Sequence, residues 1–238
     1  MSGSELKAGA RKLMMENAPK IFFISILFII ITSVMSELQI RLPGSINSGE
    51  NILDRVAARE PLGIGMIYTG FRPLGAALAL VLIIIRPVVE IGYMGYCLKT
   101  TRGDIGDYKH ILDGFALFGK TILISLIITA LVLLWSLLFI FPGIVASYRY
   151  RQAYYVLLDS PEKSAVQCIK ESKQLMSGSK LDLFLIDLGF IGWVIVDFLF
   201  VLLLRTPVAI PLVSIWLTPY MGLVRAEFYD RLLNRLVL

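Results

Sequence analysis

The chain has 238 residues, of which 57% are hydrophobic and 17% are charged, and its formal net charge is +5. A soluble domain carries about 25% charged residues, so this composition disfavours a soluble globular protein. The net positive charge does not indicate nucleic-acid binding, because most of the basic residues lie between long apolar runs. The two cysteines, Cys97 and Cys168, form no disulfide or zinc motif and are expected to be packing residues.

Long apolar runs determine the expected fold class. Residues 121–141, "TILISLIITALVLLWSLLFIF", contain no ionisable group over 21 positions, and a membrane-spanning helix needs about 20 apolar residues. The runs do not alternate apolar with polar residues, as the strands of a transmembrane barrel do. The sequence therefore predicts an all-α, polytopic membrane helix bundle that forms a single transmembrane domain over residues 1–238.

Six transmembrane helices are predicted along the chain, at residues 21–40, 74–98, 121–141, 143–158, 183–204 and 206–224. The basic residues before the first span resemble those of a signal peptide, but no small-x-small cleavage pattern follows, so we expect a retained anchor. Pro142 and Gly143 are expected to form the turn between the third and fourth spans. Pro211 and Pro219 are expected to break or kink the sixth span.

Short amphipathic helices are expected between the spans. Residues 51–60 and 105–118 each place apolar side chains on one helical face, which predicts interfacial helices. Residues 161–176 form the clearest case, with Ser160 as N-cap, Pro161 in the first turn and Gly178 after the end. The apolar stripe of this inner helix comprises Ala165, Val166, Ile169, Ser172, Leu175 and Met176. We expect it to pack on the bundle itself; the alternatives are the membrane surface and a protein partner.

The distribution of basic residues predicts the orientation in the membrane. With a cytoplasmic N-terminus, the inner segments hold 15 of the 23 Lys and Arg residues and the outer segments hold five. Cytoplasmic loops carry an excess of these residues. The sequence therefore predicts a multi-pass protein of the cell (plasma) membrane with both termini in the cytoplasm.

Six ionisable residues within the predicted spans form a candidate intramembrane polar site: Arg86, Glu90, Arg149, Arg151, Asp187 and Asp197. Such residues are costly in lipid and usually face protein or water. A rise of about 1.5 Å per residue predicts two layers. The inner layer contains Arg86, Glu90 and Asp187, and the outer layer pairs Arg149 or Arg151 with Asp197. The site is either a polar cavity that binds a solute or a set of ion pairs that fixes the helices.

The sequence contains no recognisable catalytic constellation, so we expect neither an enzyme nor a bound cofactor or metal. The expected function is a non-enzymatic accessory, scaffold or immunity-type membrane factor that acts through a protein partner at the cytoplasmic face. The alternative is a small transporter or channel with an intramembrane site for an anion or lipid headgroup. An enzyme acting on lipid or peptide substrates is a third hypothesis.

A family resemblance rests on residues 141–193, "FPGIVASYRYRQAYYVLLDSPEKSAVQCIKESKQLMSGSKLDLFLIDLGFIGW", with "LDGFALFGK" at 112–120 and "LTPYMGLVRAEFY" at 217–229. These stretches resemble a family of uncharacterised integral membrane proteins common in Gram-positive bacteria. The resemblance implies a six-helix bundle distantly similar to the membrane domain found with glycerophosphodiester phosphodiesterases. It implies no activity. Arg149 and Arg151 depart from the family pattern.

Overall fold

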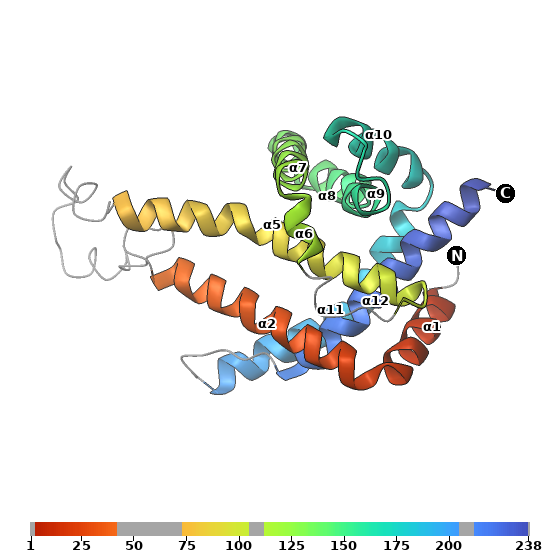
Figure 1. Cartoon of the computed structure of the whole chain (residues 1–238), viewed down its shortest axis with the longest axis horizontal. Coiled ribbons are helices and arrows are strands. Elements are labelled where there is room, and N and C mark those ends of the chain that lie inside the picture. Colours follow the sequence, from red (N-terminus) through yellow and green to blue (C-terminus); the bar gives the residue numbers. More distant parts are fainter. Residues whose placement is uncertain (1–2, 42–72, 105–111, 205–211, 238) are drawn as a thin grey trace. The chain divides into compact units, whose positions relative to one another are not determined.

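The computed structural model describes residues 3–41, 73–104, 112–204 and 212–237. Within these ranges the regular structure is entirely α-helical. The chain divides into two compact units, one comprising Met1–Ile29 with Pro87–Leu238 and the other comprising Ile30–Arg86. The predicted helical fold class is therefore confirmed for the described residues (Figure 1).

Three described helices are long and apolar enough to cross a membrane. They are α2 (Ala18–Arg41), α5 (Pro73–Thr101) and α7 (Phe118–Leu138), with candidate spans over Ala18–Gln39, Ala77–Thr101 and Phe118–Leu138. These candidates coincide with the first three predicted spans. They indicate that the protein associates with a membrane.

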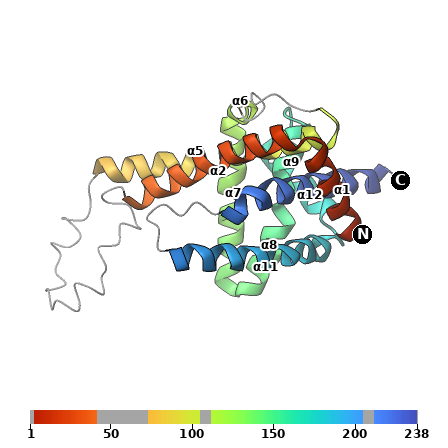
Figure 2. The ribbon, with the colours of Figure 1, turned by 90° about the horizontal axis from the view of Figure 1, so that it is seen from below.

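The helix α7 is followed by α8 (Ile140–Tyr150), and the two lie side by side as a hairpin (Figures 1 and 2). The chain reverses at Phe139, which has an extended backbone with φ −160° and ψ 153°. The prediction that Pro142 and Gly143 form this turn is wrong. Pro142 is the third residue of α8, where a backbone N–H has no partner within the helix and its absence costs little.

Gly143 has a different role from the one predicted. A Cβ at Gly143 would overlap the Oγ of Ser136 on α7 and would lie 3.0 Å from the Cα of that residue. A glycine is therefore required because the two helices approach closely at this point, as small residues allow at helix–helix contacts in membranes.

The predicted fourth span at 143–158 is divided between α8 and α9 (Ala153–Asp159), with a turn at Arg151 and Gln152. The next helix, α10 (Ala165–Leu175), is capped by Ser164, whose side chain and that of Gln167 form a reciprocal capping box. The prediction of Ser160 as N-cap is wrong, because Ser160 ends α9. Gly178 follows α10 with φ +81°, as expected for a glycine after a helix end.

The apolar stripe predicted for the inner helix packs within the bundle. Its members are buried except Val166, which is 65% exposed, and Cys168 is buried in addition. The helix α10 contacts α7, α8, α9 and α12. The expected packing of this helix on its own bundle is therefore observed.

The last two long helices are α11 (Lys180–Leu204) and α12 (Leu212–Val237), and they pack against each other. The first helix, α1 (Gly3–Glu16), packs on α12 (Figure 1). The Tyr220 hydroxyl donates to the Lys7 carbonyl at 3.2 Å, and Arg231 pairs with Glu5 at 3.4 Å. The helix α12 continues through Pro219 without ending and extends 13 residues beyond the predicted end of the sixth span at 224.

Some predicted elements lie wholly or partly outside the described residues. The interfacial helix predicted at 51–60 and the position of Pro211 are among them. Of the helix predicted at 105–118, the described part contains α6 (Asp113–Ala116) and the start of α7. Gly114 of α6 packs against the α5 backbone, where an added Cβ would lie 2.5 Å from the Val88 carbonyl oxygen.

Candidate functional site

Three side chains bind the carboxylate of Asp187, and we call these four residues, from three segments of the chain, the Asp187 cluster. Asp187, on α11, accepts a hydrogen bond from Arg151 Nη1 at 2.7 Å and from the Tyr148 hydroxyl at 3.2 Å. Its other oxygen accepts from Arg225 Nη2 at 3.0 Å and Nε at 3.3 Å. The cluster therefore links the α8–α9 segment and α12 to α11.

The charges of the Asp187 cluster are not balanced within it, because two guanidinium groups share one carboxylate. The Asp187 side chain is only 13% exposed, and the two arginine side chains are about a third exposed or less. Charge-assisted hydrogen bonds are about twice as strong as neutral ones. The cluster is thus a firm junction in which the positive charges outnumber the negative ones by one among its own members.

A cavity of about 460 Å³ adjoins the cluster. Arg151 and Arg225 both line it, and Glu90 of α5 contributes a carboxylate to the same lining. The remaining lining residues are mostly aromatic or apolar: Phe28, Tyr93, Met94, Tyr154, Tyr155, Thr218, Met221 and Gly222. The cavity therefore combines a predominantly apolar wall with charged groups of both signs.

Three close contacts lie on one side of this cavity. The Ser25 and Tyr93 hydroxyl oxygens lie 2.8 Å apart, and the Phe28 ring stacks on the Tyr93 ring with centroids 4.3 Å apart. At Gly222 a Cβ would lie 2.7 Å from the Cys97 sulfur. These contacts hold α2, α5 and α12 together around the cavity and fix its aromatic wall.

Asp197 has a different partner from the one predicted. Its carboxylate accepts hydrogen bonds from the Val213 backbone N–H at 3.2 Å and the Ser214 hydroxyl at 2.6 Å. The pairing of Asp197 with Arg149 or Arg151 is therefore wrong. The first N–H groups of a helix lack intrahelical acceptors, and Asp197 satisfies one of those at the start of α12. Arg151 binds Asp187 instead.

Arg149 lies close to aromatic and backbone groups. Its guanidinium carbon is 6.0 Å from the Tyr150 ring centroid, and its carbonyl accepts a 3.0 Å hydrogen bond from the Ser172 hydroxyl. Within the described part of the chain, its buried Nε atom has no hydrogen-bond partner. The backbone of Arg149 thus joins α8 to α10.

Two of the three residues of the predicted inner layer, Glu90 and Asp187, lie in the first compact unit. Glu90 lines the cavity beside the arginines of the cluster. Arg86 is the last residue of the second compact unit. Of the six predicted site residues, the structure thus brings Glu90, Arg151 and Asp187 to one site and uses Asp197 elsewhere.

Sequence reasoning missed Arg225, because this residue follows the predicted end of the last span at residue 224. A signal for it does exist in the sequence. Tyr220, Val224, Phe228 and Leu232 recur every four residues, which indicates one helical face that continues past residue 224, and all four are buried. A longer helix would have placed Arg225 within the bundle.

A second arginine junction lies at the ends of α5, α9 and α12. Arg102 binds the Asp159 carboxylate with contacts of 2.6 and 2.9 Å and Asp230 Oδ1 with contacts of 2.6 and 3.0 Å. The hydrogen bonds that Arg102 donates to Asp159 raise its pKa; partial burial opposes this effect, and the hydrogen bonds to Asp230 add to it. This junction is more exposed than the Asp187 cluster, so its contribution to stability is modest.

Comparisons with known proteins cover α8 to α12. Residues 140–236 match the model of a family described as "Protein of unknown function (DUF975)". No curated protein and no solved structure matches the chain. Within the described residues, no group of three or more His, Cys, Asp or Glu side chains is placed to hold a metal ion. Over the stretch that contains the entire Asp187 cluster, the chain is therefore similar to a family to which no activity is assigned.

Proposed function

We propose that the protein is a multi-pass membrane protein whose helical bundle binds the anionic group of a small solute or lipid headgroup. One observation carries this proposal: Arg151 and Arg225 share the single carboxylate of Asp187 and both line the cavity of about 460 Å³. Arginine is suited to this task because its planar guanidinium matches carboxylate and phosphate geometry. Glu90 lines the same cavity. Its carboxylate would attract a cationic group, which favours a solute that carries both charges.

The proposal includes six spans, with both termini in the cytoplasm of a bacterial cell. The excess of basic residues in the predicted inner segments supports this orientation. The packing of α1 on α12, with Glu5 bound to Arg231, supports an even number of crossings because it keeps both ends of the chain together. The apolar outer face of α11, which includes exposed Leu185, Ile191 and Val194, supports contact with lipid.

The accessory role remains the second proposal. The apolar stripe of α10 packs within the bundle, so a partner would have to contact the outer face of this helix, where Val166 is exposed beside Lys170 and Lys173. Co-purification from the membrane tests this role. A partner that is lost in a Val166→Asp variant would support it, and a partner that is retained would contradict this surface.

Thermal unfolding of the purified full chain tests the binding pocket. We expect glycine, glutamate or potassium phosphate to raise the melting temperature by about 5 °C relative to potassium chloride at equal ionic strength, because a ligand that binds only the folded state stabilises it. Thr218→Phe should abolish the increase, because Thr218 lines the cavity and a phenyl ring would obstruct part of it. Uptake of the stabilising solute into proteoliposomes then distinguishes transport from binding alone.

Thr129→Phe provides a matched control for Thr218→Phe, because Thr129 lies exposed on α7 and does not line the cavity. It should retain the stabilisation. The absence of stabilisation by any of the three solutes, or stabilisation that persists in Thr218→Phe, would contradict the proposed pocket.

A further inference from the structure

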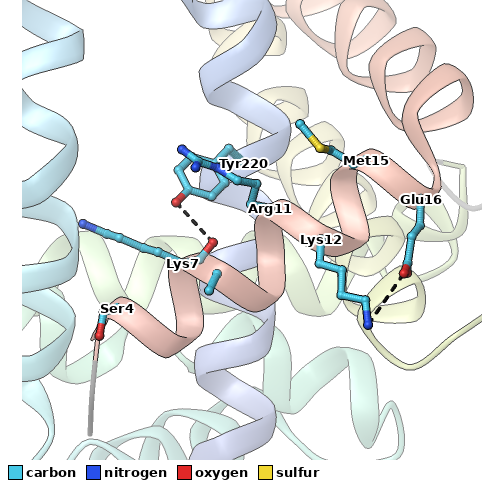
Figure 3. Close-up of a pocket in the computed structure, with 8 residues that line it drawn as sticks. Ser4, Lys7, Arg11, Lys12, Met15, Glu16 and Tyr220 are labelled. Carbon is cyan, nitrogen blue, oxygen red and sulfur yellow. Dashed lines mark hydrogen bonds and ion pairs between the residues drawn. The ribbon is translucent and has the colours of Figure 1, made fainter.

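A basic groove lies along α1 and shares no lining residue with the cavity at the Asp187 cluster (Figure 3). It has a volume of about 640 Å³, and Lys7, Arg11 and Lys12 line it together with Tyr220 of α12. We propose that this groove binds the phosphate headgroup of an anionic phospholipid. The proposal requires membrane association but does not depend on the solute pocket.

The backbone of the groove is held firmly in place. Leu6, Ala10 and Met14 on the opposite face of α1 are buried. The Tyr220 hydroxyl holds the Lys7 carbonyl, as Figure 3 shows, and a Cβ at Gly9 would lie 2.8 Å from both carboxylate oxygens of Glu227. The basic side chains therefore project from a fixed helix, which lowers the entropic cost of binding a headgroup.

The groove has an excess of positive charge. Its lining contains three basic side chains and one acidic side chain, that of Glu16. Glu16 lies 3.8 Å from Lys12 in an exposed i,i+4 pair, and exposed pairs of this kind are weak. Lys7 Nζ lies 4.8 Å from the centroid of the Phe190 ring on α11, and its side chain points away from that of Lys12 (Figure 3). Arg11 and Lys12 are therefore the basic side chains that we expect to contact the headgroup.

The position of the groove favours a lipid over a soluble phosphate compound. The helix α1 ends at Glu16, and the first candidate span begins at Ala18, two residues later. The groove thus lies at the depth of the headgroups on the side where the chain enters the membrane. Met15 also lines the groove and is 70% exposed. An apolar side chain beside basic ones is typical of helices that lie in the membrane interface.

Titration of the full chain in neutral detergent with tail-labelled phosphatidylglycerol tests the proposal. Each basic residue near an anionic surface adds to lipid affinity, so Arg11→Gln with Lys12→Gln should weaken binding by roughly tenfold or more. The matched control removes the same charge elsewhere: Lys170→Gln with Lys173→Gln on α10, where both side chains are exposed. It should change the affinity less than twofold.

A second variant tests the same site by a different route. Ala8 lines the groove, so Ala8→Glu should repel the headgroup and weaken phosphatidylglycerol binding without removing a basic residue. Unlabelled phosphatidylglycerol should compete with the probe, whereas phosphatidylcholine should not. Equal losses in the α1 and α10 variants, or equal competition by the two lipids, would overturn the proposal. Displacement of the probe by millimolar inorganic phosphate would assign the groove to free phosphate and would also overturn it.

Discussion

At the scale of single residues, Asp187 joins three segments of the bundle through one carboxylate. It binds both Arg151 and Arg225, and it also accepts a hydrogen bond from the Tyr148 hydroxyl. Removal of one member of a buried ion pair leaves uncompensated charge, which costs more than the net value of the pair. Asp187 is therefore the residue whose loss should affect the fold most directly.

We expect Asp187→Asn to destabilise the protein by about 3 kcal/mol, because the two guanidinium groups would then lose the carboxylate that they share. The melting temperature in detergent should fall by roughly 10 °C. Asp182→Asn, five residues earlier on α11, should have a much smaller effect. Adding Arg151→Gln to Asp187→Asn should cost less than the sum of the two single changes, since the repulsion disappears; simple additivity would contradict this account.

At the scale of elements, the α7–α8 hairpin depends on one close contact. The Gly143 backbone packs directly on Ser136, and the residues around the reversal, Leu137 to Phe141, are exposed and entirely apolar. An apolar tip of this kind is costly in water and favourable in lipid. The hairpin should therefore be stable only where the membrane surrounds it.

Gly143→Ala should destabilise the hairpin, because its methyl group would overlap the Ser136 side chain. We expect a cost of about 1–3 kcal/mol, which is typical of overpacked contacts and measurable by thermal unfolding in detergent. Gly192→Ala on α11 is the matched control, because no atom lies within 4 Å of a Cβ at that position. Ser136→Gly should restore part of the stability of Gly143→Ala; an absence of rescue would show that the contact is not the cause.

At the scale of the whole molecule, the sequence was sufficient to predict the helical class and the first three candidate spans, because runs such as 121–141 allow no other solution in a membrane. It was not sufficient to predict the partners of the intramembrane charges. Depth along a straight span placed Arg151 beside Asp197, but the chain reverses at Phe139, four residues before Gly143, so Arg151 lies farther from the hairpin tip than predicted. The pairing of Arg225 depended on the length of α12, which the loss of apolar character after residue 224 concealed.

The same molecular scale allows a test of membrane sidedness. In intact cells, Lys170→Cys should resist a membrane-impermeant maleimide and should react after permeabilisation, because α10 is proposed to face the cytoplasm. The native cysteines should contribute little background, because Cys97 and Cys168 are both buried. Labelling before permeabilisation would place α10 on the outer side and contradict the proposed orientation.

The pH of this experiment matters, because burial raises the pKa of Cys168. The Cys168 thiol therefore remains protonated to a higher pH than the exposed cysteine introduced at position 170, and only the thiolate reacts. Its burial as a neutral group contributes stability that is present below the ordinary thiol pKa of about 8.5 and is lost as the pH rises through the raised value. Labelling near pH 7 should thus favour the introduced cysteine.

The two arginine junctions hold the short helix α9 in place at both of its ends. Arg151 anchors the chain just before its first turn to α11 and α12, and Asp159 anchors its final turn to Arg102. A helix of seven residues that is held at both ends is expected to tilt only when one of the two ion pairs breaks. If the proposed cavity admits a solute past α9, we expect the more exposed Arg102 end to open first, and the ionic strength of the solution at that end to influence how often it opens.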